Sequence, residues 1–155
     1  MDFRITGLSP EPFRRLYGFA DEALAAEGVE RVRVTDPQAA PCRIGLDDIA
    51  PGGWALLLNY EHQPADTPYR SRHAIFVEEG AEARFDRVGE VPPALRPRTL
   101  SLRAFDASHR MIGADLVDGR EVEGLLVPML RRAGTAYVHI HYARRGCFAA
   151  QATAA

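Results

Sequence analysis

The sequence has 155 residues, of which 46% are apolar and 26% charged, and its net charge is −2. These values predict one globular domain over residues 1–155 and offer no basic patch for nucleic acid. All 19 basic residues are arginine, which excludes Schiff-base catalysis by lysine and a phosphate-binding P-loop with its lysine.

The location expected for this chain is the cytoplasm. No apolar run approaches the roughly 18 residues that a membrane-spanning helix needs. The N-terminus also lacks the positive start and apolar stretch of a signal peptide. In a reducing compartment Cys42 and Cys147 are expected to be free thiols.

The first third of the chain predicts a strand, a helix and a second strand. Residues 2–6 form the expected first strand. Ser9 and Pro10 are typical of a helix start, and Gly28 of a helix stop, so the helix is expected over 9–27. Valine alternates with charged residues over 29–34, which predicts a half-buried strand.

The middle of the chain predicts two strands joined by a long loop. The apolar segments 54–60 and 73–77 read as strands, and 61–72 between them contains two prolines. A loop of about a dozen residues without regular structure is uncommon and often functional. The polar, proline-broken segment 80–98 is expected to be a surface excursion.

The last third predicts a hairpin, a helix and two final strands. The hairpin pairs 99–105 with 111–117, and Asp118 and Glu121 fit a capping box for a helix over 119–133. Pro128 within that helix predicts a kink or a break. Strands are expected over 136–142 and 147–150. Without regular strand–helix alternation, the order favours an α+β domain with a mainly antiparallel sheet and two principal helices, 9–27 and 119–133.

Two histidines lie on one face of the expected strand 136–142. His139 and His141 are two residues apart, about 6.5–7 Å along a strand. Such a pair suits a ligand or acid–base site, or a metal site with a further ligand from Glu61, His62, His73 or His109. An ordinary solvated sheet face would show the same alternation.

The turn after this strand decides where Cys147 points. A three-residue loop with Gly146 in its left-handed position would pair Ala143 with Cys147. Cys147 would then join the histidine face, while Phe148 joined the core face. Beside Arg144 and Arg145, Cys147 is a candidate nucleophile, and a small buried thiol is the alternative.

The loop 59–71 is rich in side chains that orient ligands. Tyr69 and Arg70 are suited to holding a carboxylate or phosphate. Arg70 could equally pair with a surface acid. The ligand-binding candidates in this loop are Asn59, His62, Tyr69, Arg70 and Ser71.

The same segments carry a family resemblance. LLLNYEHQPADTPYR at 56–70 and HIHYARRGC at 139–147, with PCR at 41–43 and LSLRAFD at 100–106, resemble the bacterial family catalogued as domain of unknown function 1203. The resemblance covers nearly the whole chain and implies a small single-domain bacterial protein. It implies no activity, cofactor or catalytic residue.

Together these features give a hypothesis of one composite site for a small anionic ligand. The loop 59–71, the histidine strand and the turn 144–147 would form it, with His139, His141 and Cys147 as catalytic candidates. Arg70, Arg144 and Arg145 would hold the negative charge. A metal-dependent enzyme using His139 and His141 and a non-catalytic interaction module are the alternatives. No motif indicates a cofactor or an oligomeric state.

Overall fold

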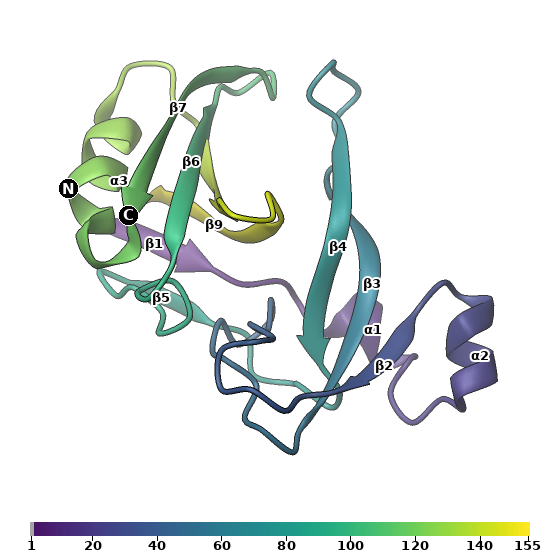
Figure 1. Cartoon of the computed structure of the whole chain (residues 1–155). Coiled ribbons are helices and arrows are strands. Elements are labelled where there is room, and N and C mark those ends of the chain that lie inside the picture. The colour runs from purple at the N-terminus through teal and green to yellow at the C-terminus, as the bar shows by residue number, and fades with distance from the viewer. Residues whose placement is uncertain (1) are drawn as a thin grey trace.

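The computed structural model describes residues 2–155, which form two antiparallel sheets (Figure 1). The larger sheet has the strand order β5-β1-β9-β8-β6-β7, and the smaller one has the order β2-β3-β4. Every pair of neighbouring strands is antiparallel. The strands are β1 (Phe3–Thr6), β2 (Glu30–Arg33), β3 (Trp54–Gln63), β4 (Ser71–Glu78), β5 (Asp86–Val88), β6 (Thr99–Phe105), β7 (Met111–Asp118), β8 (Tyr137–Tyr142) and β9 (Phe148–Ala154).

The predicted N-terminal helix is two short helices, so the expectation of one helix over 9–27 was wrong. The helices α1 (Glu11–Arg14) and α2 (Asp21–Ala26) are separated at Gly18, whose φ of +77° cannot continue a helix. Phe13 and Leu24 are still buried, one from each helix. The apolar spacing therefore identified the buried side chains correctly while missing the break.

The second predicted helix is present. A 3-10 turn, η1 (Gly119–Glu121), leads into α3 (Val122–Arg131). The Asp118 side chain accepts a hydrogen bond from the Arg120 backbone N–H, so it caps η1. A kink or a break was predicted at Pro128; the helix continues through this residue, so there is no break.

The loop predicted over 61–72 is shorter than expected, because both strands extend into it. β3 runs to Gln63 and β4 begins at Ser71, with an irregularity in register between Tyr60 and Gln63. The surface excursion 80–98 also contains β5, which pairs with β1. The fold is nevertheless the α+β architecture with mainly antiparallel sheets that the sequence predicts.

Two hydrophobic clusters make up the core. One lies between the six-stranded sheet and α3, which packs on the face away from β3 and β4 (Figure 1). The other surrounds β3, β4, α1 and the segment 40–49. Between the clusters the opposite face of the six-stranded sheet meets the β3–β4 hairpin. We call this region the seam, and its side chains include His62, His139, His141 and Phe148.

Candidate functional site

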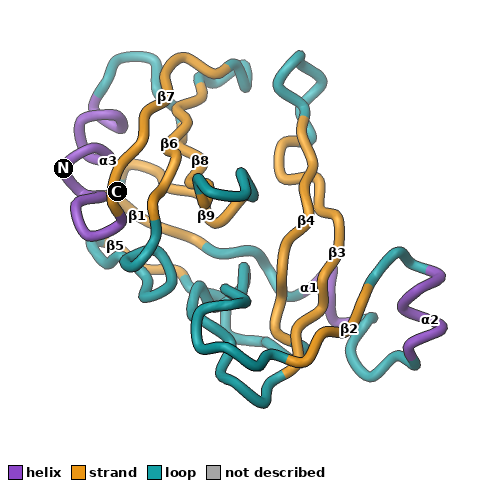
Figure 2. The backbone as a smooth tube through the Cα atoms, viewed as in Figure 1, coloured by secondary structure: helices purple, strands orange, loops and turns teal. Residues whose placement is uncertain are grey.

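The register of the β8–β9 turn reverses the predicted positions of Cys147 and Phe148. The Tyr142 N–H donates to the Cys147 carbonyl, and the Gly146 N–H donates to the Tyr142 carbonyl. Tyr142, not Ala143, therefore closes the turn, although Gly146 has the expected left-handed conformation, with φ +80°. Figure 2 shows this loop on the side of the sheet that faces β3 and β4.

A bulge in β9 confines this shift to the residues nearest the turn. Ile140 pairs with Ala150 and His141 pairs with Phe148, so one residue of β9 is skipped. Phe148 consequently lies on the histidine face, and Cys147 belongs to the cluster on the α3 side. The expectation that Cys147 joins the histidines was wrong, because the turn closes one residue earlier than a three-residue loop would.

The histidine face is buried, not solvated. His139 is 4% exposed and His141 is 1% exposed. His62 of β3 covers them, with ring centroids 6.2 Å from His139 and 5.0 Å from His141. The Phe148 ring stacks on His62, at 5.4 Å and nearly parallel. His62, a candidate from the segment 59–71, thus contacts the histidine strand across the seam.

Burial keeps these three imidazoles neutral at physiological pH. It lowers the pKa of His62 to about 4, of His139 to about 4 and of His141 to about 3. The positive charge of Arg103, which faces the seam from β6, acts in the same direction on all three. Neutral imidazole has one N–H donor and one bare acceptor nitrogen.

A cavity of about 460 Å³ opens beside these rings. At its edge the Tyr137 hydroxyl accepts from Gln63 (2.9 Å) and lies 2.8 Å from His109 Nδ1. The Nδ1 atoms of His62 and His139 are buried and have no hydrogen-bond partner. We call this the histidine cavity; it is lined by His62, Gln63, Pro64, Ala65, His109, Tyr137, His139 and Gln151.

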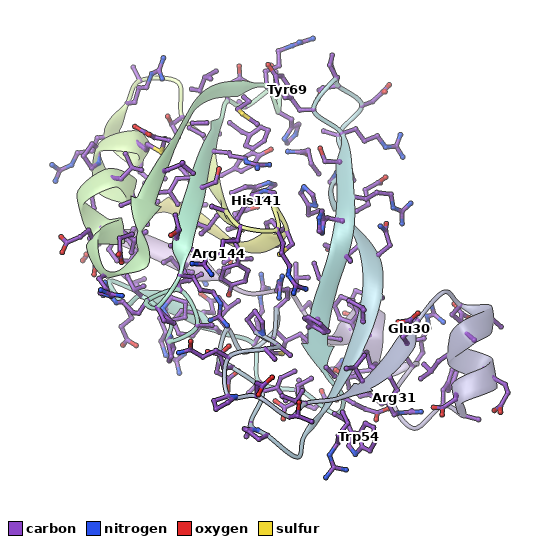
Figure 3. All side chains as sticks on the ribbon, viewed as in Figure 1. Glu30, Arg31, Trp54, Tyr69, His141 and Arg144 are labelled. Carbon is purple, nitrogen blue, oxygen red and sulfur yellow. The ribbon has the colours of Figure 1, made fainter. Side chains whose placement is uncertain are left out.

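A second cavity, of about 390 Å³, lies at the β8–β9 turn. Its lining contains four arginines and no acidic side chain. Figure 3 shows Arg144, from this turn, in the region between the two sheets. We call this the arginine cavity; it is lined by Gln38, Ala39, Pro41, Arg43, Phe76, Pro97, Arg98, Thr99, Tyr142, Arg144, Arg145 and Cys147.

Arg43 is the most unusual residue of the arginine cavity, because it is 1% exposed and has no carboxylate partner. Its guanidinium donates to the carbonyls of Phe148 (2.7 Å) and Pro41 (2.5 Å) and to Cys147 Sγ (3.0 Å). Arginine has five N–H donors, so three bonds leave two donors unused. Burial lowers the pKa of Arg43, yet a guanidinium stays protonated in proteins.

Tyr142 lies between two guanidinium groups of the same cavity. The Arg43 and Arg98 carbons are 4.8 Å and 5.2 Å from its ring centre, a cation–π arrangement. Burial raises the pKa of Tyr142 to about 12, so its hydroxyl stays protonated. That hydroxyl is buried and has no partner. Arg98 differs from Arg43 in that Asp48 holds it, at 2.6 Å.

The other candidates of the 59–71 loop line neither cavity. Arg70 pairs with Glu61 at 3.2 Å, the surface pairing that was the alternative, and Asn59 accepts a hydrogen bond from Arg72. Ser71 donates to the Tyr69 carbonyl. The predicted composite site is therefore divided: His62 joins the histidines, while Arg144, Arg145 and Cys147 line the arginine cavity.

Sequence reasoning missed Arg43, Arg98, Tyr142 and the pair of glutamines in the histidine cavity. Arg43 alone had a local signal, because it lies between Cys42 and Ile44, two apolar residues that are both buried. A charged residue inside an apolar run indicates a charge held in the interior. The sequence around Gln63 and Gln151 gave no comparable indication. These two residues line the same cavity only because β3 of the small sheet packs against the six-stranded sheet, which contains β9.

Within residues 2–155, no three His, Cys, Asp or Glu side chains are arranged to hold a metal ion. His62, one of the candidate third ligands, lies against His139 and His141, but these three side chains are not arranged to hold an ion. Among the helices described, none is long and apolar enough to cross a membrane.

Comparison with known proteins finds one family. A family model described as "Protein of unknown function (DUF1203)" matches residues 39–153. The chain belongs to the DUF1203 family. The DUF1203 region includes every residue that lines the histidine cavity and, apart from Gln38, every residue that lines the arginine cavity. No curated protein and no solved structure matches the chain.

Proposed function

We propose that this protein binds a small molecule through a carboxylate or phosphate group in the arginine cavity. The observation that carries the proposal is Arg43, a buried cation with two unused donors and no acidic partner. Burying an unpaired charge is costly, and an oxyanion with bidentate geometry would offset that cost. Free thiols at Cys42 and Cys147 support the cytoplasm as the compartment.

The rim and wall of the cavity support the same chemistry. Arg144 and Arg145 are exposed, and neither forms an ion pair with any residue from 2 to 155. They would attract an anion toward the cavity. The unpartnered Tyr142 hydroxyl would donate a hydrogen bond to it. Arg43 and Arg98 would hold the anion, and Cys147 remains a candidate nucleophile against it.

Calorimetric titration with inorganic phosphate, malonate and citrate tests this proposal. We expect binding by at least one of them, and about tenfold weaker binding by the R144Q/R145Q variant, which corresponds to about 1.4 kcal/mol. R110Q/R131Q is the matched control, because it removes two exposed arginines that line neither cavity. Equal weakening in both variants, or no binding of any of the three anions, would overturn the proposal.

A second candidate function is favoured by the unpartnered Nδ1 atoms of His62 and His139. A polar group of a small molecule in the histidine cavity would satisfy them, with His139, which lines the cavity, as base or hydrogen-bond donor. Nitrogen-15 NMR of the imidazoles, with glycerol, glucose and malate as probes, tests this idea. The His139 Nδ1 resonance should move while that of His73, which does not line the cavity, stays fixed. Equal movement of both would argue against a site.

A further inference from the structure

The two cysteines of this chain form a natural pair for comparison. Both are free and buried. Cys147 lines the arginine cavity, and its sulfur accepts a hydrogen bond from Arg43 at 3.0 Å. Cys42 lines neither cavity, and its sulfur accepts backbone N–H bonds from Ile44 (3.4 Å) and Glu78 (3.2 Å). Burial raises the pKa of the Cys42 thiol.

The arginines around Cys147 favour the approach of negatively charged molecules to its sulfur. Four arginines line the cavity, and Asp48 neutralises one of them, Arg98. The exposed Arg144 and Arg145 stand at the opening. A positive cleft raises the local concentration of anions and lowers that of cations. The unpartnered Tyr142 hydroxyl in the same cavity independently indicates space for a polar group of a ligand.

We propose that Cys147 is a modification site for small disulfides that carry carboxylates. This inference rests on the proposed anion binding in the arginine cavity. The carboxylate would lie on the arginines while the Cys147 thiolate attacks one sulfur of the disulfide. A new sulfur–sulfur bond forms at Cys147, the bond within the reagent breaks, and its second half leaves as a thiolate that solvent protonates. The thiol proton of Cys147 passes to solvent, and the disulfide is the oxidant.

Three symmetrical disulfides of similar size test the charge selection: dithiodipropionate (anionic), hydroxyethyl disulfide (neutral) and cystamine (cationic). Each rate is divided by that of N-acetylcysteinamide, a thiol without a charged group, with the same reagent, which corrects for the different leaving thiols. Peptide mass mapping assigns the modified cysteine. For Cys147 we expect the corrected anionic rate to exceed the neutral rate about tenfold, with the cationic rate lowest. Cys42 should stay unmodified.

Two arginine double variants then test whether Arg144 and Arg145 cause the preference for the anionic reagent. In R144Q/R145Q the anionic preference should fall toward unity, and in R110Q/R131Q it should persist. Inorganic phosphate should slow the anionic reagent more than the neutral one. Similar corrected rates for all three reagents, or faster modification of Cys42, would overturn the inference.

The phosphate titration of the wild-type protein separates the two proposals. If phosphate binds but Cys147 shows no charge preference, the modification site fails and the anion site stands. If phosphate, malonate and citrate all fail to bind and the preference is absent, both fail.

Discussion

The histidine cavity is lined by Tyr137 and His139 at the start of β8, and the arginine cavity by Tyr142 at its end. Burial affects the charge of the lining side chains differently in the two cavities. The histidines lose their charge on burial, since their pKa values fall to about 4 and about 3. Arg43 cannot do the same, because a guanidinium stays protonated. Burial thus gives one cavity neutral donors and acceptors and leaves the other with a positive charge that an anion can match.

The largest expected effect is a loss of unfolding free energy at low pH, which comes from the residues of the histidine cavity and their neighbour His141. The folded-state pKa values of His139 and His141 lie below the unfolded value of about 6.5. The folded protein then binds protons more weakly, so stability is complete above about pH 6.5 and is lost as pH falls toward 4. For the two histidines together we expect a loss on the order of 5 kcal/mol by about pH 4.5 in urea unfolding.

The H139Q/H141Q variant is the control for this pH dependence, although His62, His109 and Arg103 still face the same region. Its unfolding free energy should change much less over that range. A wild-type protein with the same pH profile as the variant would contradict neutral, buried histidines.

The paired arginine of the arginine cavity gives the next largest effect. Arg98 donates to Asp48 through two nitrogens, and both side chains are about one-fifth exposed or less, at 17% and 20%. Arg98→Gln should lower the unfolding free energy by about 2 kcal/mol in chemical denaturation. The more exposed pair of Arg96 with Glu123, each 40% exposed, is the comparison. Arg96→Gln should cost about 0.5 kcal/mol, and equal costs would remove the distinction.

The smallest expected effect comes from removing the hydroxyl of either Tyr17 or Tyr142. The Tyr17 hydroxyl donates to the Ala81 carbonyl at 2.8 Å, whereas the Tyr142 hydroxyl has no partner. Tyr17→Phe should therefore cost about 1 kcal/mol of stability, and Tyr142→Phe about 0. Tyr142→Phe should instead weaken anion binding by calorimetry. A stability cost for Tyr142→Phe as large as that for Tyr17→Phe would show that its hydroxyl already has a partner.

The alternation along β8 was enough to predict that His139 and His141 share a face, because side-chain direction in a strand is a local property. It could not show that β3 covers this face, since that contact joins segments far apart in the sequence. The skipped residue in β9 had no local signal either, because Ala149 lies in an alanine-rich strand. The turn closes one residue earlier than predicted, and the bulge at Ala149 takes up this shift, so the predicted position of Cys147 was wrong.

The β6–β7 hairpin was predicted correctly from its two strands, although its turn at 106–110 contains no glycine or proline. Residues 99–105 and 111–117 pair as β6 and β7, as the sequence predicts. Gly18, in contrast, was not recognised as the end of a helix, because the apolar spacing continues past it to Leu24. Apolar periodicity predicts which side chains are buried. It does not predict whether they lie on one helix or two, because that depends on the backbone conformation of Gly18.

The bulge at Ala149 separates the register of the β8–β9 turn from that of the rest of β9. His141 pairs with Phe148 on the turn side, and Ile140 pairs with Ala150 beyond the bulge. The rest of β9 is also held by its pairing with β1. A one-residue change in the turn can therefore be taken up at the bulge, so that only the residues nearest the turn change faces and the centre of the six-stranded sheet keeps its packing.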